Sequence, residues 1–392
     1  ASNAGGVPNG LGEGGLKVDE DALTQGWLNA KDPTQTVADG QTTVNIQQTG
    51  DKAVLNWETF NVGQNTKVDF DQQSDWAVLN RVNDPNARPS QIQGQISGEG
   101  TVLLVNRNGV MFSGGSQVNV RNLVVAAANI SDDQFLDRGL YSALEDGAHL
   151  PSFTDAGGAI QVDAGAQITT AAPTTGLRGG GYALLLGNEV HNAGTITTSK
   201  GQTQLVAGDS FIIRKGAGTE ANTFSTTRGN EVAPQFDADS SAGQVSNTGL
   251  IQAREGDITL AGRDVRQDGV AVATTTVNNR GTIHLLNSAS DALGQVTLGK
   301  DAITAVVIED DGKTTALDSQ RDALIADSVK LDKLRAQAAA GAYDNLSRLS
   351  DRRDQSRIEI VSGGDVRFEG DSLTLATGGQ IAVTAADRAF VA

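Results

Sequence analysis

The chain has 392 residues, of which 47 are glycine and only 4% are aromatic, and its formal net charge is −17. This composition favours a stack of thin repeats that bury Val, Ile, Leu and Ala over a compact core built on aromatic side chains. The negative charge argues against a nucleic-acid partner, because phosphate binding needs a basic surface, and the lack of cysteine excludes a disulfide framework.

Residues 1–14 are small and polar, which is typical of a flexible mature N-terminus that follows a cleavage site. The glycines of residues 6–15 do not form a phosphate-binding loop, because they follow no strand, precede no helix and lack the lysine of that motif. No apolar run approaches the roughly 18 residues that cross a bilayer, so we predict no membrane insertion. The chain shows no signal peptide and no stop signal at its end, and we interpret it as a piece of a longer protein.

Residues 15–135 are predicted to be rich in strands. The apolar runs 101–105, 117–120 and 122–130 have the length of strands and are bounded by glycine or asparagine. A solenoid needs a covered first rung, since an open one would expose an apolar face and free strand edges. We therefore expect residues 15–135 to include a β cap at the N-terminal end of such a solenoid.

An internal repeat is the main pattern of residues 136–314. Its first half reads Asn-x-Gly-x-Ile, and its second half is a short alternating strand between glycines. The first half occurs at 192–196, 247–251 and 279–283, followed by second halves at 201–208, 256–262 and 294–299. Residues 181–187 and 370–379 match the second half alone.

This repeat predicts the fold. Alternation such as Ile258–Thr259–Leu260 points side chains to opposite faces of a strand, and Asn and Gly at the ends let the chain turn a corner. A two-strand unit cannot bury its apolar face alone, so neighbouring units must stack. We predict an all-β protein, a right-handed parallel β-helix, in which residues 216–243 are a loop excursion.

Residues 315–355 differ from the rest of the chain. They are rich in Ala, Leu, Lys, Arg and Asp, with leucines spaced along one helical stripe. Gly341 would end a first helix, and a second would run over residues 344–352. We predict a helical hairpin inserted in the β-helix, as a brace on the rod or as an arm that binds a partner. Residues 356–392 are predicted to form further, truncated rungs.

Three segments of the N-terminal third, 56–70, 78–112 and 122–135, resemble in order the secretion domain of two-partner secretion exoproteins. These are the filamentous-haemagglutinin-like adhesins and cytolysins, whose secretion domain is also called the haemagglutination activity domain. The resemblance implies an exoprotein that is secreted to the cell surface of a Gram-negative bacterium. It further implies that residues 15–135 carry the part recognised by an outer-membrane β-barrel transporter, whose periplasmic domains bind the unfolded chain before the β-helix folds.

A four-residue motif of that family, Asn-Pro-Asn-Gly, aligns with Asn106, Arg107, Asn108 and Gly109, where Arg107 stands in place of the proline. The resemblance implies that these residues take part in transporter recognition. Considered without the family, Asn and Gly after an apolar strand simply predict a turn. Both interpretations remain open at the level of sequence.

The sequence offers no set of residues for catalysis. His149, His191 and His284 are far apart and lack metal-ligand spacing, although Glu189 and His191 could share a strand face. Two aspartates at 237 and 239 lack the glycine-centred pattern of a calcium loop. We therefore predict neither an enzyme nor a bound cofactor or metal.

The function we predict is that of the secretion domain and first stalk of a large exported adhesin, which supports attachment or biofilm formation. A polysaccharide or a host surface ligand is the expected binding partner beside the transporter, and we expect a monomer. An alternative is the export module of a contact-dependent toxin or cytolysin whose active domain lies downstream. A third possibility is the capture of a ligand such as a haem carrier.

Overall fold

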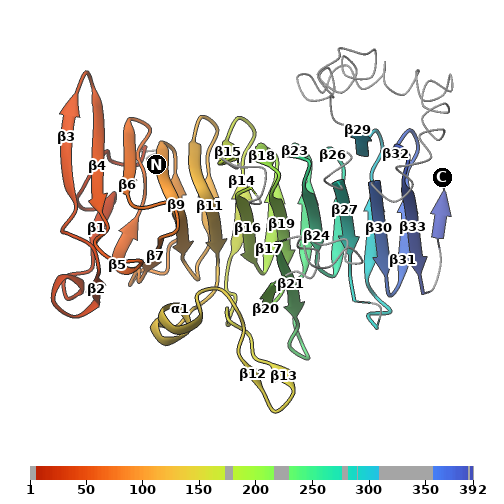
Figure 1. Cartoon of the computed structure of the whole chain (residues 1–392), viewed down its shortest axis with the longest axis horizontal. Coiled ribbons are helices and arrows are strands. Elements are labelled where there is room, and N and C mark those ends of the chain that lie inside the picture. The colour runs from red at the N-terminus through yellow and green to blue at the C-terminus, as the bar shows by residue number, and fades with distance from the viewer. Residues whose placement is uncertain are drawn as a thin grey trace, which may run out of the picture.

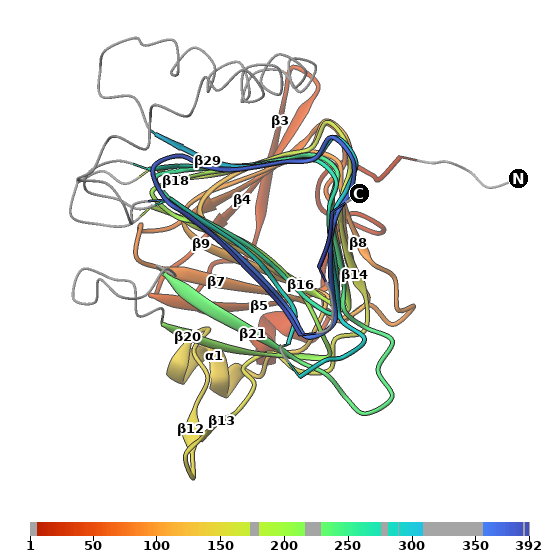
Figure 2. The same ribbon diagram turned by 90° about the vertical axis from the view of Figure 1, so that its right-hand side faces the viewer.

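The computed structural model describes residues 6–172, 180–215, 229–275, 281–288, 290–308, 356–386 and 389–391. Its strands wind around a common axis and stack into an elongated rod from the N-terminal to the C-terminal end (Figure 1). Viewed along that axis the coil is triangular, with three flat faces joined at corners (Figure 2). Strands of successive turns pair in parallel on every face, which confirms the predicted parallel β-helix.

Each face is a ladder of parallel strands. Face 1 consists of β4 (Gln41–Gln47), β6 (Thr66–Asp71), β15 (Gln167–Thr170), β18 (Thr195–Ser199), β23 (Leu250–Arg254), β26 (Val270–Thr275), β29 (Ile303–Ile308) and β32 (Leu373–Ala376). Face 2 consists of β5 (Lys52–Phe60), β7 (Ala77–Val82), β16 (Tyr182–Gly187), β19 (Gln202–Ala207), β24 (Asp257–Ala261), β27 (Gly281–Leu286), β30 (Ser356–Ser362) and β33 (Gln380–Ala385). Face 3 consists of β8 (Ser90–Ile92), β10 (Val110–Phe112), β14 (Ala159–Val162), β17 (Glu189–Asn192), β22 (Gln244–Asn247), β25 (Asp264–Gln267), β28 (Gln295–Leu298), β31 (Asp365–Phe368) and β34 (Ala389–Val391).

Two long strands, β9 (Gln95–Val105) and β11 (Gln117–Ala126), belong to two faces at once. Their first halves pair within face 1 and their second halves within face 2. Faces 1 and 2 are therefore continuous through these strands, whereas face 3 is a separate sheet.

The N-terminal end is closed by antiparallel strands. The strands β1 (Leu16–Val18) and β2 (Trp27–Leu28) pair with β5, and β3 (Thr34–Ala38) pairs with β4. A π-helix, η1 (Ala22–Gly26), lies between β1 and β2. Residues 6–15 lie against this cap, where the Gly10 N–H donates to Thr66 Oγ1 over 2.9 Å. The first rung is thus covered, as the predicted β cap requires.

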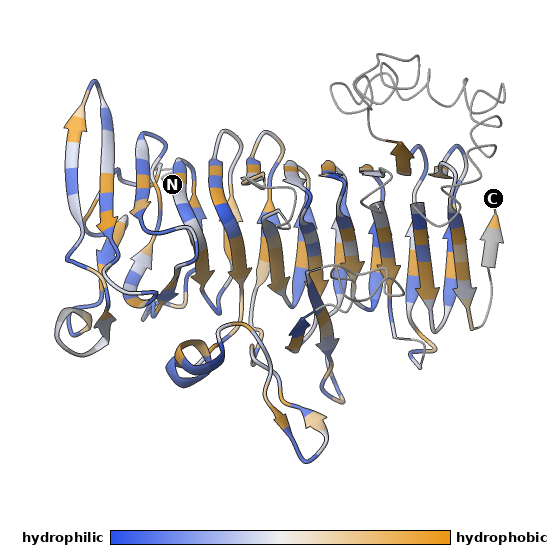
Figure 3. Cartoon of the chain, viewed as in Figure 1, coloured by the Kyte–Doolittle hydropathy of each residue, from blue (hydrophilic) through white to orange (hydrophobic). Residues whose placement is uncertain are grey.

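The interior is filled by stacked aliphatic side chains. On face 3, Val190, Val245, Val265 and Val296 occupy the same register position on successive strands, and each exposes at most 1% of its surface. The residues that flank each of these valines on its own strand point outward and are mostly polar, so hydropathy alternates along the strands (Figure 3). Because the register repeats from rung to rung, the core forms continuous columns along the rod.

A second apolar layer covers the outer side of face 2 in the N-terminal half. It is built from α1 (Asp132–Arg138) and from the antiparallel hairpin of β20 (Ser210–Lys215) with β21 (Asn230–Gln235). A second, exposed hairpin of β12 (Leu144–Glu145) with β13 (Ala148–His149) projects away from the rod (Figure 1). Phe135 of α1 and Phe211 of β20 are buried in one cluster with Leu103 and Leu184, two side chains of face 2. This face is therefore apolar on both sides, which explains the continuous apolar runs noted in the sequence.

The predicted repeat is correct for two of its three copies. Residues 192–196 and 247–251 stack in register. The third copy is wrong, because Ile283 lies on face 2 opposite Ile258, and residue 279 is outside the described residues. The true successor of Asn247 is Gln267, which turns the same corner before Gly269. Glutamine can take the place of asparagine at this corner because its side-chain amide also accepts a hydrogen bond from one neighbouring rung and donates one to the other.

The prediction is also wrong for two strands of the second half of the repeat. Residues 294–299 contain β28, which belongs to face 3, and residues 370–379 contain β32, which belongs to face 1. Every face uses short alternating strands bounded by glycine, so the pattern alone does not distinguish the faces. The segment 216–243, predicted as a loop, contains β21 in its described part. The predicted helical hairpin, 315–355, lies outside the described residues.

Candidate functional site

The predicted recognition motif forms a tight turn between β9 and β10. The Gly109 N–H donates to the Asn106 carbonyl over 2.9 Å, and the Asn108 N–H donates to Asn106 Oδ1 over 3.0 Å. Asn106 itself is fully buried. Its side-chain amide donates to the Arg88 carbonyl (3.1 Å) and to Ser90 Oγ (3.0 Å), so it fastens the turn to the segment that enters β8.

Gly109 occupies a position that requires glycine. Its φ of +116° lies in a region that L residues rarely adopt. A Cβ placed there would lie 2.7 Å from the carbonyl oxygen of Ala159 on the next rung. The Gly109 carbonyl also accepts a 3.0 Å hydrogen bond from Ser90 N, so the residue is held between two rungs.

Arg107, which replaces the proline of the family motif, points away from the core. Its Nε and Nη2 donate to Oδ2 and Oδ1 of Asp155 over 2.8 and 3.0 Å, in a two-pronged ion pair. The hydrogen bond with that carboxylate raises the pKa of Arg107. The Arg107 side chain is 46% exposed, so solvent screens the pair and it adds little stability.

The turn therefore has one buried and one exposed half. Asn106 and Gly109 are enclosed by neighbouring rungs, whereas Arg107 and part of Asn108 face solvent. A partner that meets the folded domain can touch the exposed half only. The four residues of the turn are predictable from the sequence, but Ser90 and Asp155 are not, because the coil brings these in from segments far away in the chain.

The histidines are placed on separate parts of the described structure. His149 lies on the β12–β13 hairpin, His191 on face 3 and His284 on face 2. On face 3, His191 Nδ1 lies 2.6 Å from Ser246 Oγ and Nε2 lies 3.2 Å from Glu189 Oε2. The sequence predicts Glu189 beside His191 but not Ser246, which lies 55 residues further along the chain. Over the described ranges, no three His, Cys, Asp or Glu side chains gather as a metal site.

The aspartates at 237 and 239 lie in the exposed loop that follows β21. The Asp237 N–H donates to Asp209 Oδ2 over 2.9 Å, which fixes the start of this loop to the residue that precedes β20. Within the described part of the chain, no helix combines the length and apolarity needed to span a membrane.

The sequence profile of the TPS secretion domain matches residues 21–296, well over half of the chain. The chain therefore belongs to the two-partner secretion family, as the resemblance predicted. Domains of this family engage an outer-membrane transporter, and their exoproteins are secreted to the cell surface of Gram-negative bacteria. This confirms the predicted localisation.

Two curated relatives are both named heme/hemopexin-binding protein and come from Haemophilus influenzae. One is 40% identical over 97 residues, which cover 24% of this chain and 10% of the relative. The other, from strain Rd, is 28% identical over 270 residues, which cover 64% of this chain and 26% of the relative. The matches thus span about a quarter or less of the relatives' length. Neither name is that of an enzyme.

Two solved structures are similar to this chain. The crystal structure of the HMW1 secretion domain from Haemophilus influenzae superposes with a TM-score of 0.53 at 19% identity, covering 96% of this chain and 87% of that one. The filamentous hemagglutinin secretion domain gives a TM-score of 0.45 at 14% identity, with coverages of 92% and 100%. At such identity the HMW1 match concerns the fold alone, and it is consistent with the β-helix described above.

Proposed function

We propose that this chain is the export module of a large surface exoprotein, and that residues 106–109 are read by the transporter before the β-helix folds. The observation that carries this proposal is the burial of Asn106, whose side chain is enclosed between the Arg88 carbonyl and Ser90. A receptor that uses the Asn106 amide must bind it in the unfolded chain. In the folded domain the same amide serves only to hold the turn.

The test is a secretion assay in a Gram-negative host, with a signal peptide supplied and the partner transporter present or absent. The wild-type chain is expected in the medium only when the transporter is present. Asn106→Ala and Asn108→Ala are expected to lower export several-fold, whereas Arg107→Ala is expected to leave it unchanged, because the family motif has a different residue there.

A stability-matched control separates recognition from folding. Asn247 is also a fully buried asparagine whose side chain, like that of Asn106, makes three hydrogen bonds, but it lies far along the rod from the motif. Asn247→Ala should weaken folding about as much as Asn106→Ala. If both variants lose export equally, the turn acts through folding alone and the recognition proposal is refuted.

We further propose that the complete exoprotein serves attachment, with this domain as its first stalk and a polysaccharide or host surface as its target. A stiff β-helical rod supports this role, because it holds its exposed loops and strand faces away from the cell. Deleting residues 216–243 together with 315–355 should reduce adhesion if these segments bind the target. A toxin or cytolysin would use the same export step and would differ only in its downstream domain.

A second candidate function, capture of haem through its carrier hemopexin, is favoured by the names of the two curated relatives. The relatives are matched over a quarter of their length at most, so their binding regions can lie elsewhere. The check is surface plasmon resonance of the purified chain over immobilised hemopexin, with and without haem. Saturable binding would favour capture over general attachment.

A further inference from the structure

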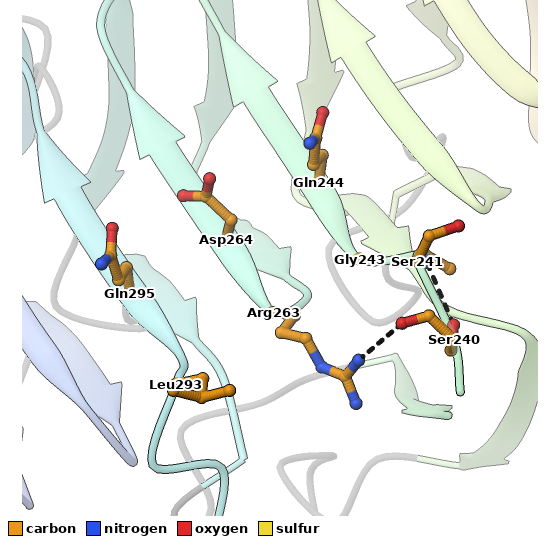
Figure 4. Close-up of a pocket in the computed structure, with 9 residues that line it drawn as sticks. Ser240, Ser241, Gly243, Gln244, Arg263, Asp264, Leu293 and Gln295 are labelled. Carbon is orange, nitrogen blue, oxygen red and sulfur yellow. Dashed lines mark hydrogen bonds between the residues drawn. The ribbon is translucent and has the colours of Figure 1, made fainter. Parts of the chain in front are cut away.

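A pocket of about 330 Å³ opens at the corner where the chain passes from face 2 to face 3 (Figure 4). Its wall is formed by the outer side of β22, β25 and β28. The loop that leads into β22 and the residues that lead into β28 form its rim. Because its wall is a hydrogen-bonded sheet, the side chains of the wall are held at fixed spacing.

Three polar side chains line the wall at one register position. Gln244, Asp264 and Gln295 are direct partners on neighbouring strands, about 4.8 Å apart from rung to rung. All three point outward, because the residue after each of them is a buried valine of the core column. Along the rod they present an amide, a carboxylate and an amide. The two amides can donate and accept hydrogen bonds, and the carboxylate between them accepts.

The rim is held by Arg263, whose charge is already compensated. Its Nε donates to Asp291 Oδ2 over 3.0 Å and its Nη1 donates to the Ser240 carbonyl over 3.1 Å. The guanidinium also stacks on the ring of Phe236, 4.4 Å from the ring centroid. These contacts tie the two rim segments together and leave no unpaired cation at Arg263 for an anionic ligand.

One apolar side chain completes the pocket. Leu293 is 87% exposed beside Gln295, where it has no role in the core. A set of alternating donors and acceptors next to an exposed apolar group matches a sugar ring, whose hydroxyls both donate and accept and whose C–H face is apolar. A phosphate would need an available positive charge, and a divalent cation would need more carboxylates than Asp264 supplies.

The polar row continues beyond the pocket. Glu189 precedes Gln244 and Asp365 follows Gln295 at the same register position. A parallel row two residues further along each strand contains His191, Ser246, Arg266 and Thr297, of which Arg266 is paired with Asp268 and Thr297 is buried. A ligand that extends along the rod would therefore meet polar side chains of the first row on successive rungs, which favours a chain of sugars over a single small molecule.

We propose that this surface binds a neutral oligosaccharide, with its hydroxyls on Gln244, Asp264 and Gln295 and a ring face against Leu293. The proposal rests on the attachment role proposed above and assigns that role to specific residues of this chain. It does not depend on transporter recognition, because the turn at 106–109 is not among the pocket residues.

The experiment is calorimetric titration of the full 392-residue chain with neutral hexasaccharides of glucose, mannose or galactose, and with a sulfated heparin hexasaccharide. At least one neutral hexasaccharide should bind saturably. The double variant Gln244→Ala/Gln295→Ala should weaken that binding at least tenfold, because it removes two hydrogen-bonding groups. Gln167→Ala, which truncates an exposed, outward glutamine of β15 on face 1, away from the pocket, is the matched control and should bind like wild type.

Three results would overturn the proposal: no binding of any neutral hexasaccharide, binding of the sulfated one alone, or binding that survives the double variant. The double variant is also run in the secretion assay, where export equal to wild type is expected. A loss of sugar binding with normal export separates this site from the export function. Normal sugar binding in Asn106→Ala would make the same separation in the other direction.

Discussion

The side-chain amide of Asn192 donates to Oδ1 of Asn247 over 2.9 Å, joining two residues that are 55 positions apart in the sequence. Asn247 Nδ2 in turn donates to Gln267 Oε1 over 2.8 Å, and Gln267 Nε2 donates to the Ile303 carbonyl over 2.7 Å. Asn192, Asn247 and Gln267 are buried at the corner between faces 3 and 1. The ladder satisfies the polar groups that a sharp corner would otherwise leave unpaired inside the rod.

Breaking this ladder should cost far more than an equivalent change on the surface. Asn247→Ala removes one acceptor of the Asn192 amide and the donor to Gln267 Oε1 in a buried site, and we expect the free energy of unfolding to fall by about 2–4 kcal/mol. The free energy of unfolding is measured by urea denaturation followed by circular dichroism. Gln244→Ala, an exposed truncation three residues earlier on the same strand, should change it by less than about 0.5 kcal/mol. Equal effects would show that the ladder does not stabilise the corner.

The sequence predicts the stacked, parallel architecture because it depends on local signals. Alternating residues, frequent glycine and few aromatics each favour thin stacked strands. The assignment of strands to faces does not follow from local signals, because it depends on how many residues each excursion inserts between corners. The motif at 279–283 looks like the copies at 192–196 and 247–251, yet its strand lies on face 2. The successor at Gln267 lacks the asparagine that the repeat pattern required.

The candidate site is likewise only partly predictable from the sequence. The turn at Asn106–Gly109 follows from residue types alone, as a strand that ends in Asn and Gly. Its fixed geometry depends on Ser90 and Ala159, which the β-helix brings in from the previous and next rungs. The pocket residues Gln244, Asp264 and Gln295 have no local pattern at all, because only the register of three strands aligns them.

Gly109→Ala tests whether the turn requires glycine for space as well as for backbone conformation. The added Cβ would press on the Ala159 carbonyl while φ stays positive, and we expect a loss of about 2–4 kcal/mol in the free energy of unfolding. Gly115→Ala is the matched control, because Gly115 has φ +89° but nothing within 4 Å of a Cβ. It should cost only about 1 kcal/mol. Similar losses for the two variants would mean that crowding by the next rung is unimportant.

The Arg107–Asp155 ion pair should contribute little to stability despite its good geometry. Both side chains are about half exposed, at 46% and 60%, so water and salt screen the attraction. In a double-mutant cycle of Arg107→Ala, Asp155→Ala and the double variant, we expect a coupling energy below about 1 kcal/mol that shrinks at high salt. A larger, salt-insensitive coupling would show that this pair fastens the turn to the following loop.

Tyr182 should make the domain sensitive to alkali. It lies at the start of β16 beneath the outer apolar layer, and burial raises the pKa of its phenol above the usual value of about 10. As the pH rises, the unfolded chain therefore loses the phenol proton before the folded chain does. The stabilisation due to the protonated phenol is complete below about pH 10 and declines as the pH rises towards the raised pKa. Between pH 8 and pH 11, the free energy of unfolding should fall by about 1 kcal/mol less in Tyr182→Phe than in the wild type. The comparison is made by urea denaturation at both pH values. Parallel losses in the two proteins would place the phenol in contact with water and contradict its burial.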